Sequence, residues 1–362
     1  MKKFFLLFIA AVSLCALFAQ ENLNVANQGV NWNKYDFVPG TDIIFEDNLE
    51  GEQNGEFPSK WDLVGGTVEN ANLDGENVIM FIDMGAFLNK MGIVPMIKNP
   101  ATDYLPEEFT IEFDAYFEQN LPSGNLYRIY LYDAKNQKNK IDSKLYPAID
   151  ITQQTVRFGD ATGGYPGSNL TPSKPFTVKN PGWRHVAISF NKRALKVYLD
   201  DARIVNAPNV GFDPVGLTLL FNARNDKKGY IKNIRIAKGA VPLYDKLLTD
   251  GKFVTTGIRF DVNKATIKPE SMGTLNYVVK MMTDNPSLNF SVEGHTDSDG
   301  DEALNQKLSE QRAKAIMDKL IEMGIVANRL SSKGWGESKP MNTNSNKEEK
   351  AQNRRVEFVK SN

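Results

Sequence analysis

The sequence has little cysteine or histidine: one cysteine and two histidines among 362 residues. This scarcity nearly rules out a zinc site built from Cys and His ligands, and it makes a Cys–His or Ser–His nucleophilic enzyme a poor candidate. An excess of one charge is also missing, because 43 basic residues face 44 acidic ones for a net charge of −1. Nucleic-acid-binding proteins show a clustered basic excess, so the balance argues against that class.

Long apolar runs are confined to the start of the chain. Two lysines precede an apolar run from Phe4 to Phe18, and the small residue Ala19 is followed by polar residues. This layout is typical of a secretory signal peptide, so we predict export and cleavage after Ala19. No other segment reaches the roughly 20 apolar residues that a membrane-spanning helix needs. We therefore expect no transmembrane helix in the mature protein.

The single cysteine, Cys15, lies inside this apolar run. One interpretation makes Cys15 the lipidated first residue of a lipoprotein, and the other makes it one more apolar residue of the signal. Bulky Leu14 stands where lipoprotein signals carry a small residue, and the apolar run continues past the cysteine. We favour cleavage without lipidation. The mature protein would then have no cysteine, and its stability would come from hydrophobic cores and not from disulfides.

The remaining chain divides into two patterns. Residues 20–40 form a polar, Asn-rich lead-in, and residues 41–245 consist of short alternating runs separated by Gly, Pro, Asn and Asp. Examples of such runs are residues 109–117 and 126–132. Period-2 alternation with turn residues between the runs predicts an all-β sandwich. Helical periodicity is nearly absent from this part of the sequence.

Helical and strand patterns alternate after residue 250. A short strand at 253–260 is followed by Leu275, Val278, Val279 and Met282, whose spacing places them on one face of a helix. Alternation at 288–292 predicts another strand. A second helix opens near Asp299 and Asp301, and it ends at Gly324, a helix terminator. Its expected buried stripe consists of Leu304, Leu308, Ile316 and Leu320. With two more strands, at 329–335 and 354–359, residues 252–362 form a small α+β domain.

Two charged residues of this domain, Asp297 and Arg312, allow two interpretations. Asp297 follows the expected strand, and Arg312 lies on the apolar stripe of the second helix, where an unpaired charge is costly. The first interpretation is a salt bridge that joins the helix to the strand end. The second is a zwitterionic ligand, with its ammonium on Asp297 and its carboxylate in the planar fork of Arg312.

Residues 252–362 closely resemble the OmpA-like peptidoglycan-binding domain, which also occurs in the peptidoglycan-associated lipoprotein and in flagellar stator proteins. The resemblance covers about a third of the chain. The matching elements are residues 258–264, 294–297 and 305–313, Gly324, Arg329, Leu330, residues 334–336, Pro340 and residues 353–356. So many elements at matching spacing make the resemblance specific.

This resemblance implies a βαβαββ fold that binds the diaminopimelate of the peptidoglycan stem without covalent chemistry or a cofactor. It implies that Asp297 binds the ligand ammonium and that Arg312 binds the carboxylate. The other residues of the implied pocket are Asp261, Asn263, Thr296, Asn305 and Arg354. It also implies a location in the periplasm, bound to the cell wall and associated with the outer membrane of a Gram-negative-type envelope.

The sandwich region resembles a laminin-G or concanavalin-like jelly roll more loosely, through residues 182–190, 195–200 and 229–236. Jelly rolls bind glycans, proteins or calcium, and some are glycosidases, so the fold alone does not decide the function. We expect this domain to hold an outer-membrane or periplasmic protein or glycan. The whole protein would then tether that partner to the wall. The alternative is a wall-tethered jelly roll that binds or cleaves glycans.

The enzyme alternative depends on Glu112, Asp114 and Glu118, which share one face of an expected strand and resemble the clustered acids of jelly-roll glycosidases. Along a regular strand Glu112 and Glu118 are roughly 20 Å apart, whereas paired glycosidase carboxyls are about 5–10 Å apart. We therefore interpret the acids as a polar outer face and predict that the protein is not an enzyme. His295 has no second His or Cys nearby, so we predict a packed histidine at the pocket rim and no metal site.

Overall fold

The structure, a computed structural model, describes residues 36–361 with internal gaps. The gaps are residues 84–90, 98–103, 119–120, 122–123, 133–147, 154, 160–181, 201, 211–212, 223–225 and 240–242. The predicted signal peptide, Cys15 and most of the polar lead-in lie outside the described residues. No helix in the described part of the chain is long and apolar enough to cross a membrane.

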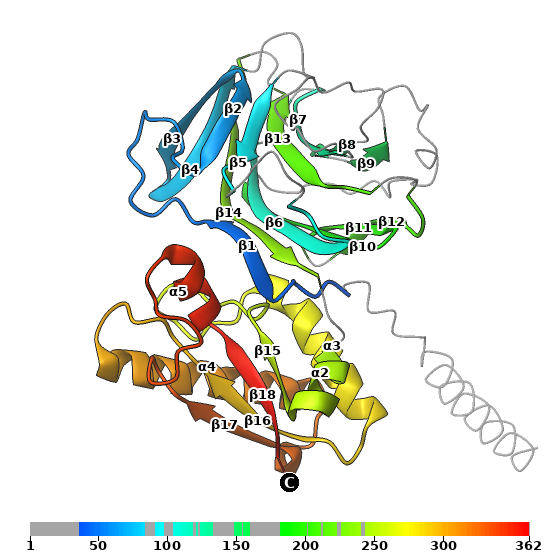
Figure 1. Ribbon diagram of the computed structural model, residues 1–362, viewed down its shortest axis with the longest axis vertical. Helices are drawn as coiled ribbons and strands as arrows, with labels where there is room; N and C mark the ends of the chain where they lie inside the picture. Colours follow the sequence, from blue (N-terminus) through cyan, green and yellow to red (C-terminus); the bar gives the residue numbers. More distant parts are fainter. Residues whose placement is uncertain are drawn as a thin grey trace, which may run out of the picture. The chain divides into compact units, whose positions relative to one another are not determined.

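The N-terminal region consists of two antiparallel sheets (Figure 1). In spatial order the larger sheet contains β12 (Ala202–Ala207), β11 (Ala194–Leu199), β10 (Gly182–Asn191), β6 (Glu108–Phe117), β14 (Gly229–Lys238), β4 (Glu76–Asp83) and β3 (Thr67–Leu73), and β1 (Asp42–Asp47) also pairs with β14. The smaller sheet contains β2 (Trp61–Gly65), β5 (Gly92–Pro95), β13 (Gly216–Asn222), β7 (Leu126–Tyr132), β8 (Ala148–Ile151) and β9 (Val156–Gly159).

Both sheets bury their inner faces in one hydrophobic core. The residues that β6 contributes include Ile111, Phe113, Ala115 and Phe117, each at most 2% exposed. These are the positions that the alternation predicts to face inward. The smaller sheet contributes Ile129 and Leu219 to the same core. The sheet-rich region therefore fits an all-β sandwich, while its assignment as a laminin-G or concanavalin-like jelly roll stays a prediction.

The outer face of β6 differs from the predicted solvated polar face. Glu112 is only 1% exposed. Its carboxylate lies 3.4 Å from His185 Nε2, 3.6 Å from Arg235 Nη1 and 3.3 Å from Arg259 Nη2. Arg259 belongs to the C-terminal domain, so Glu112 is covered by a segment that is distant in sequence. The pattern within one strand carries no signal of such a contact.

The C-terminal domain is built on a four-stranded sheet (Figure 1). Its spatial order is β15 (Lys252–Thr255), β18 (Val356–Ser361), β16 (Asn289–Gly294) and β17 (Leu330–Gly334), with only β16 and β17 parallel. The helices are α2 (Leu243–Asp250), α3 (Met272–Asp284), α4 (Glu302–Glu322) and α5 (Lys347–Asn353), and 3₁₀ turns occupy η3 (Pro269–Ser271) and η4 (Ala327–Arg329). Residues of α3, α4 and the sheet share one hydrophobic core.

The predicted order of strands and helices is present, with three local differences. The strand expected at 253–260 ends at Thr255. Helix α5 is additional and lies between the last two strands of the chain. Helix α2 begins within the range that the sequence pattern gives to the sandwich, yet its Leu247 is 2% exposed in the core of the C-terminal domain.

Helix α4 buries a stripe different from the predicted one. Ile316 and Leu320 are buried as expected, but Leu304 is 67% exposed and Leu308 is only half-buried. The small and polar residues Asn305, Ser309 and Ala313 are buried in their place. The first half of the helix is therefore rotated by about one residue from the orientation that its leucines predict.

Two glycines explain this rotation. A Cβ at Gly294 would lie 2.5 Å from the carbonyl oxygen of Ser309, and a Cβ at Gly334 would lie 2.4 Å from the backbone nitrogen of Glu310. Real side chains do not tolerate such distances, so α4 rests directly on the glycines at the ends of β16 and β17. Only small side chains fit beneath a helix at this separation, and Leu304 therefore points to solvent.

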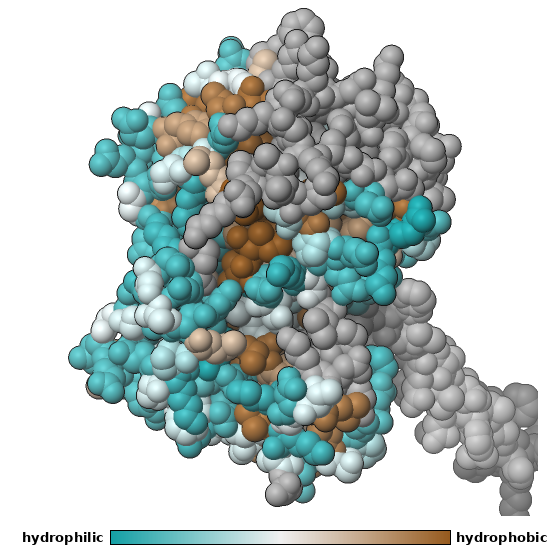
Figure 2. Space-filling view, viewed as in Figure 1, coloured by the Kyte–Doolittle hydropathy of each residue, from teal (hydrophilic) through white to brown (hydrophobic). Residues whose placement is uncertain are grey.

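The surface in the view of Figure 2 is largely hydrophilic, with separate hydrophobic areas. The large hydrophobic residues that are exposed are Leu63, Met96, Leu248, Val262, Leu304, Val326 and Met341. Val262, at 85%, has the highest exposure of this set, and it lies in the loop that follows Asp261. Scattered exposed apolar residues are normal for folded proteins.

Candidate ligand-binding site

The loop that carries Asp297 follows β16 and is held by backbone hydrogen bonds. His295 N–H donates to the carbonyl of Arg355 at 3.0 Å, and Thr296 N–H donates to the carbonyl of Gly336 at 2.9 Å. The Asp297 carboxylate accepts from the backbone N–H of Asp299 at 3.2 Å, and its side chain is 10% exposed. The carboxylate is thus fixed at the end of a strand with part of its surface accessible.

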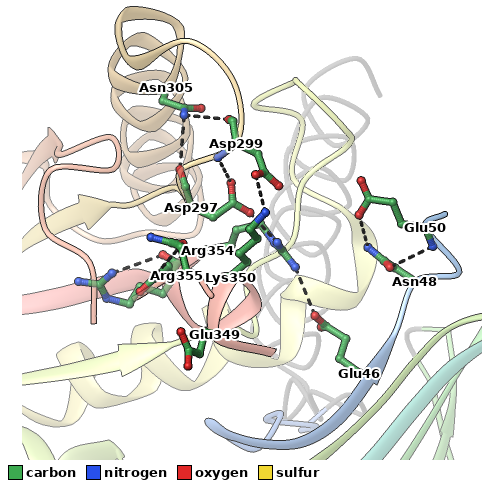
Figure 3. A network of polar contacts seen from close by, with 12 residues as sticks. Glu46, Asn48, Glu50, Asp297, Asp299, Asn305, Glu349, Lys350, Arg354 and Arg355 are labelled. Atoms are coloured by element: carbon green, nitrogen blue, oxygen red, sulfur yellow. Dashed lines mark hydrogen bonds and ion pairs between the residues drawn. The ribbon is translucent and has the colours of Figure 1, made fainter. Parts of the chain in front are cut away.

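Asn305 holds this loop in place and is itself buried. Its side-chain amide donates to the carbonyls of Asp297 at 3.4 Å and Asp299 at 3.0 Å (Figure 3). It also donates to the Glu337 carboxylate at 2.8 Å. These contacts occupy the donor capacity of the amide. Asn305 therefore positions the Asp297 loop from the first turns of α4.

The guanidinium of Arg312 is held by backbone carbonyls. Its Nε donates to the carbonyl of Lys264 at 3.0 Å, its Nη2 donates to the carbonyl of Asp261 at 3.4 Å, and it lies 4.9 Å from the ring centre of Phe260. Among the described residues, no carboxylate lies within ion-pair distance of Arg312. Burial, together with the nearby charge of Arg354, lowers its pKa, while Asp297 acts in the opposite direction. The site therefore contains a fixed cation that has no direct counter-ion in the described part of the chain.

Asp297 pairs with Arg354 and not with Arg312. Arg354 Nη1 lies 2.6 Å from Asp297 Oδ2, and its Nη2 lies 3.2 Å from Glu46 Oε2 (Figure 3). The Arg354 side chain is 40% exposed, so the pair lies at the mouth of the site. The salt bridge between Asp297 and Arg312, one of the two interpretations of the sequence, is therefore not the arrangement found.

A cavity of about 260 Å³ lies beside these residues. Of the predicted pocket residues, Arg312 and Arg354 line the cavity. Asp297 does not line it but is bonded to Arg354, which does. Asp261 contributes a carbonyl to Arg312, and Asn263 is exposed in a left-handed conformation with φ of 55°. Thr296 is buried, and its hydroxyl has no hydrogen-bond partner.

One side of the cavity consists of residues that no sequence motif identifies. Glu46, Asp47 and Asn48, from the end of β1, line the same space as Arg312. These residues are at least 210 positions away from the recognised motifs, which begin at residue 258, and no local pattern marks them. Only the folded chain brings them to the site.

His295 is buried beside the site, as predicted for a packed histidine. Burial and the charge of Arg355 lower its pKa to about 4, so the ring is neutral near pH 7. Glu293, His295 and Glu357 offer ligand atoms within 4.8 Å of one another, a spacing that could hold a metal ion. However, Glu357 already pairs at 2.6 Å with both Lys252 and Arg355, whose charges oppose a bound cation.

The acids of β6 belong to a second charged cluster, whose Arg235 and Arg259 also line this cavity. Burial would raise the pKa of Glu112, but Arg259, His185 and Arg235 bring it down to about 2. Burial would lower the pKa of His185, but Asp114 and Glu112 raise it to about 9. Glu112 and His185 are therefore both charged at neutral pH. The cluster has the properties of a buried ion-pair network.

Comparisons with known proteins find similarity in the C-terminal segment of the chain. The OmpA family model matches residues 259–354. Outer membrane porin F of Pseudomonas aeruginosa is 43% identical over 105 residues, covering 29% of this chain and 30% of the porin. The probable lipoprotein YiaD of Escherichia coli is 37% identical over 142 residues, covering 36% of this chain and 63% of the lipoprotein.

Among solved structures, the cell wall anchor of the T6SS from Pseudomonas aeruginosa aligns at 25% identity and a TM-score of 0.28, covering 33% of this chain and 94% of that one. A putative MotB-like protein from Desulfovibrio vulgaris aligns at 25% identity and a TM-score of 0.29, covering 30% and 72%. The chain spans about a third of the length of the porin F relatives. The C-terminal segment is thus an OmpA-like domain, joined to a sheet-rich N-terminal region.

Proposed function

We propose that the C-terminal domain binds peptidoglycan without covalent chemistry, through the diaminopimelate of the stem peptide. One observation carries the proposal: the Arg312 guanidinium is fixed by two carbonyls, has no carboxylate within ion-pair distance among the described residues, and interacts electrostatically with the partly accessible carboxylate of Asp297. A group with an ammonium and a carboxylate on one carbon would satisfy both charges. The free end of diaminopimelate is such a group.

The expected interaction energies are consistent with selective and reversible binding of the ligand. A hydrogen bond to a charged group contributes about 1.5–3 kcal/mol, and Arg312 offers the planar fork that matches a carboxylate. The ligand ammonium would meet Asp297, whose present partner Arg354 is 40% exposed and is therefore displaced at little cost. The resemblance of this domain to the OmpA family supports the same ligand class.

The sandwich would then hold an outer-membrane or periplasmic partner, and the protein would tether that partner to the wall. The relatives named above as an outer membrane porin and a lipoprotein support a location in the envelope. We place the protein in the periplasm, bound to the wall and associated with the outer membrane. We propose no cofactor for this role.

Substitution of the two charged residues tests the binding proposal. Asp297→Ala and Arg312→Ala should each weaken sedimentation with purified cell-wall sacculi by about ten- to hundredfold, since each leaves one ligand charge unmatched. Lys314→Ala and Asp318→Ala are matched controls, because these residues form an exposed ion pair on the same helix, α4. A folded Arg312→Ala variant with wild-type sedimentation would contradict the proposal.

The second candidate function, cleavage of wall glycans by the sandwich, has less support. The acids that favoured it, Glu112 and Asp114, both lie within hydrogen-bonding or ion-pair distance of His185. Incubation of the pure protein with peptidoglycan, followed by an assay for new reducing sugar ends, distinguishes the two functions. We expect no release of reducing ends, and release above a heat-treated control would favour the enzyme.

A further inference from the structure

The cavity beside Arg312 has a wall that comes from the N-terminal sandwich. Strand β1 ends there, and Glu46 and Asn48 line the cavity together with Arg312 and Arg354. The OmpA-like segment by itself therefore does not contain every residue of the site. A residue of the sandwich is placed where it can influence which ligand binds.

Glu46 belongs to a chain of three charges. Arg354 donates to Asp297 Oδ2 at 2.6 Å through Nη1 and to Glu46 Oε2 at 3.2 Å through Nη2 (Figure 3). The side chains are 10% exposed for Asp297, 21% for Glu46 and 40% for Arg354. Arg354 thus lies between two carboxylates, one from each domain.

The fold holds this end of β1 firmly. Glu46 opposes Arg235 in the pairing of β1 with β14, and its carbonyl accepts from Lys60 Nζ at 2.7 Å. The next residue, Asp47, is 1% exposed and accepts from the indole N–H of Trp61 at 2.8 Å. Glu46 is therefore presented to Arg354 from a fixed backbone.

The charges suggest a specific role for this contact. Asp297 and Glu46 contribute two negative charges and Arg354 and Arg312 two positive ones, so these four groups sum to zero. A ligand ammonium that binds Asp297 takes the oxygen that Arg354 now occupies. Arg354 then needs another acceptor, and Glu46 is already bonded to it.

We propose that Glu46 is a specificity-determining residue of the wall-binding site. It receives Arg354 when a ligand ammonium binds Asp297, and it offsets the positive charge of the two arginines. The site therefore favours a ligand end that carries both an ammonium and a carboxylate over one that carries a carboxylate alone. This inference rests on the proposed function and adds the contribution of the sandwich to it.

The test uses the full chain and two synthetic stem tripeptides, measured by isothermal titration calorimetry. One peptide carries diaminopimelate, and the other carries aminopimelate, which keeps the distal carboxylate and lacks the distal ammonium. Glu46→Gln should bind the diaminopimelate peptide about three- to fivefold more weakly than wild type, and the aminopimelate peptide at least as well as wild type. The loss should shrink in high salt, because the contact is partly exposed.

Glu56→Gln is the matched control, since Glu56 is an exposed residue of the same domain and makes the same change in net charge. Glu46→Asp is the second variant: it keeps the charge but withdraws it from Arg354, so it should give a smaller loss in the same direction. Equal affinity of Glu46→Gln and Glu56→Gln for the diaminopimelate peptide overturns the inference and leaves the proposed function intact. Failure of the wild type to bind that peptide overturns both.

Discussion

Removal of the buried charge of Glu112 should strongly destabilise the protein. The carboxylate lies within 3.6 Å of nitrogen atoms of His185, Arg235 and Arg259, and the residue is 1% exposed. Glu112→Gln keeps the size of the side chain and removes the charge. Three cations then remain together without their shared anion. Loss of one partner from a buried ion pair typically costs about 3–5 kcal/mol, because the remaining charge is left uncompensated.

The lowered pKa of Glu112 leads to a similar magnitude for the stability that its charge contributes. The pKa of Glu112 is about 2, against an ordinary value of 4.5, because Arg259, His185 and Arg235 outweigh the effect of burial. A difference of about 2.5 pKa units corresponds to roughly 3 kcal/mol in favour of the charged form. The raised pKa of His185 includes the same interaction with Glu112. The stability contributions of Glu112 and His185 are therefore not added.

The dependence on pH follows from both groups. Glu112 has a lowered pKa, so its contribution is present above about pH 4.5 and is lost as the pH falls towards 2. His185 has a pKa raised from 6.5 to about 9, so its contribution is complete below pH 6.5 and is lost as the pH rises through 9. This cluster therefore stabilises the fold most between about pH 4.5 and 6.5.

Scanning calorimetry from pH 3 to 10 measures these effects. Glu112→Gln should lower the melting temperature by about 5 °C or more at pH 6, and it should flatten the decline of stability between pH 6.5 and 9. Glu118→Gln is the control, because Glu118 forms a partly exposed pair with Lys227 and should change the melting temperature little. A Glu112→Gln variant that melts within a degree of wild type at pH 6 would refute the reasoning.

Three further predictions concern the C-terminal domain. Gly334→Ala should destabilise it by about 1–3 kcal/mol in urea unfolding, because the added Cβ would overlap the backbone of α4; wild-type stability would contradict the close approach. Leu320→Ala should cost about 2–5 kcal/mol, whereas Leu304→Gln should change stability by less than about 0.5 kcal/mol because Leu304 is 67% exposed; equal losses would reverse this assignment. A fragment of residues 243–362 should fold alone and melt at a higher temperature than residues 252–362, because α2 adds a buried leucine to the core; identical melting curves would contradict that role.

The sequence predicted the elements of the C-terminal domain well but misjudged how one of them packs. The periodicity of α3 and the ends of α4 follow from local residues: Gly324 has φ of 102° and ends the helix. The leucine spacing in α4 failed in its first half, because the closeness of helix and sheet is set by Gly294 and Gly334 on other elements. Helical periodicity describes one element and carries no information about the distance to its neighbour.

In the candidate site, too, some features could be predicted from local sequence and others depend on contacts between distant segments. The residues in the motifs around Asp297 and Arg312 could be named from sequence because they recur at fixed spacing in the family that the domain resembles. Arg354 could be named as a pocket residue in the same way, but its pairing with Asp297 and the contribution of Glu46 could not be predicted. Arg354 pairs with Asp297 across 57 positions, and Glu46 reaches Arg354 across 308. Ion pairs between segments so distant leave no periodic trace in either segment.

The sequence by itself determined the two-part organisation, the inward-facing residues of β6 and the OmpA-like character of the C-terminal domain, because alternation, helical spacing and spaced motifs are local properties of the chain. Only the tertiary structure decided which charges neutralise one another. The fold buries Glu112 among three cations, leaves Arg312 without a direct carboxylate partner among the described residues, and brings Glu46 of the sandwich to Arg354. Coulomb interactions act through space, so the charge balance of the site exists only once the chain has folded.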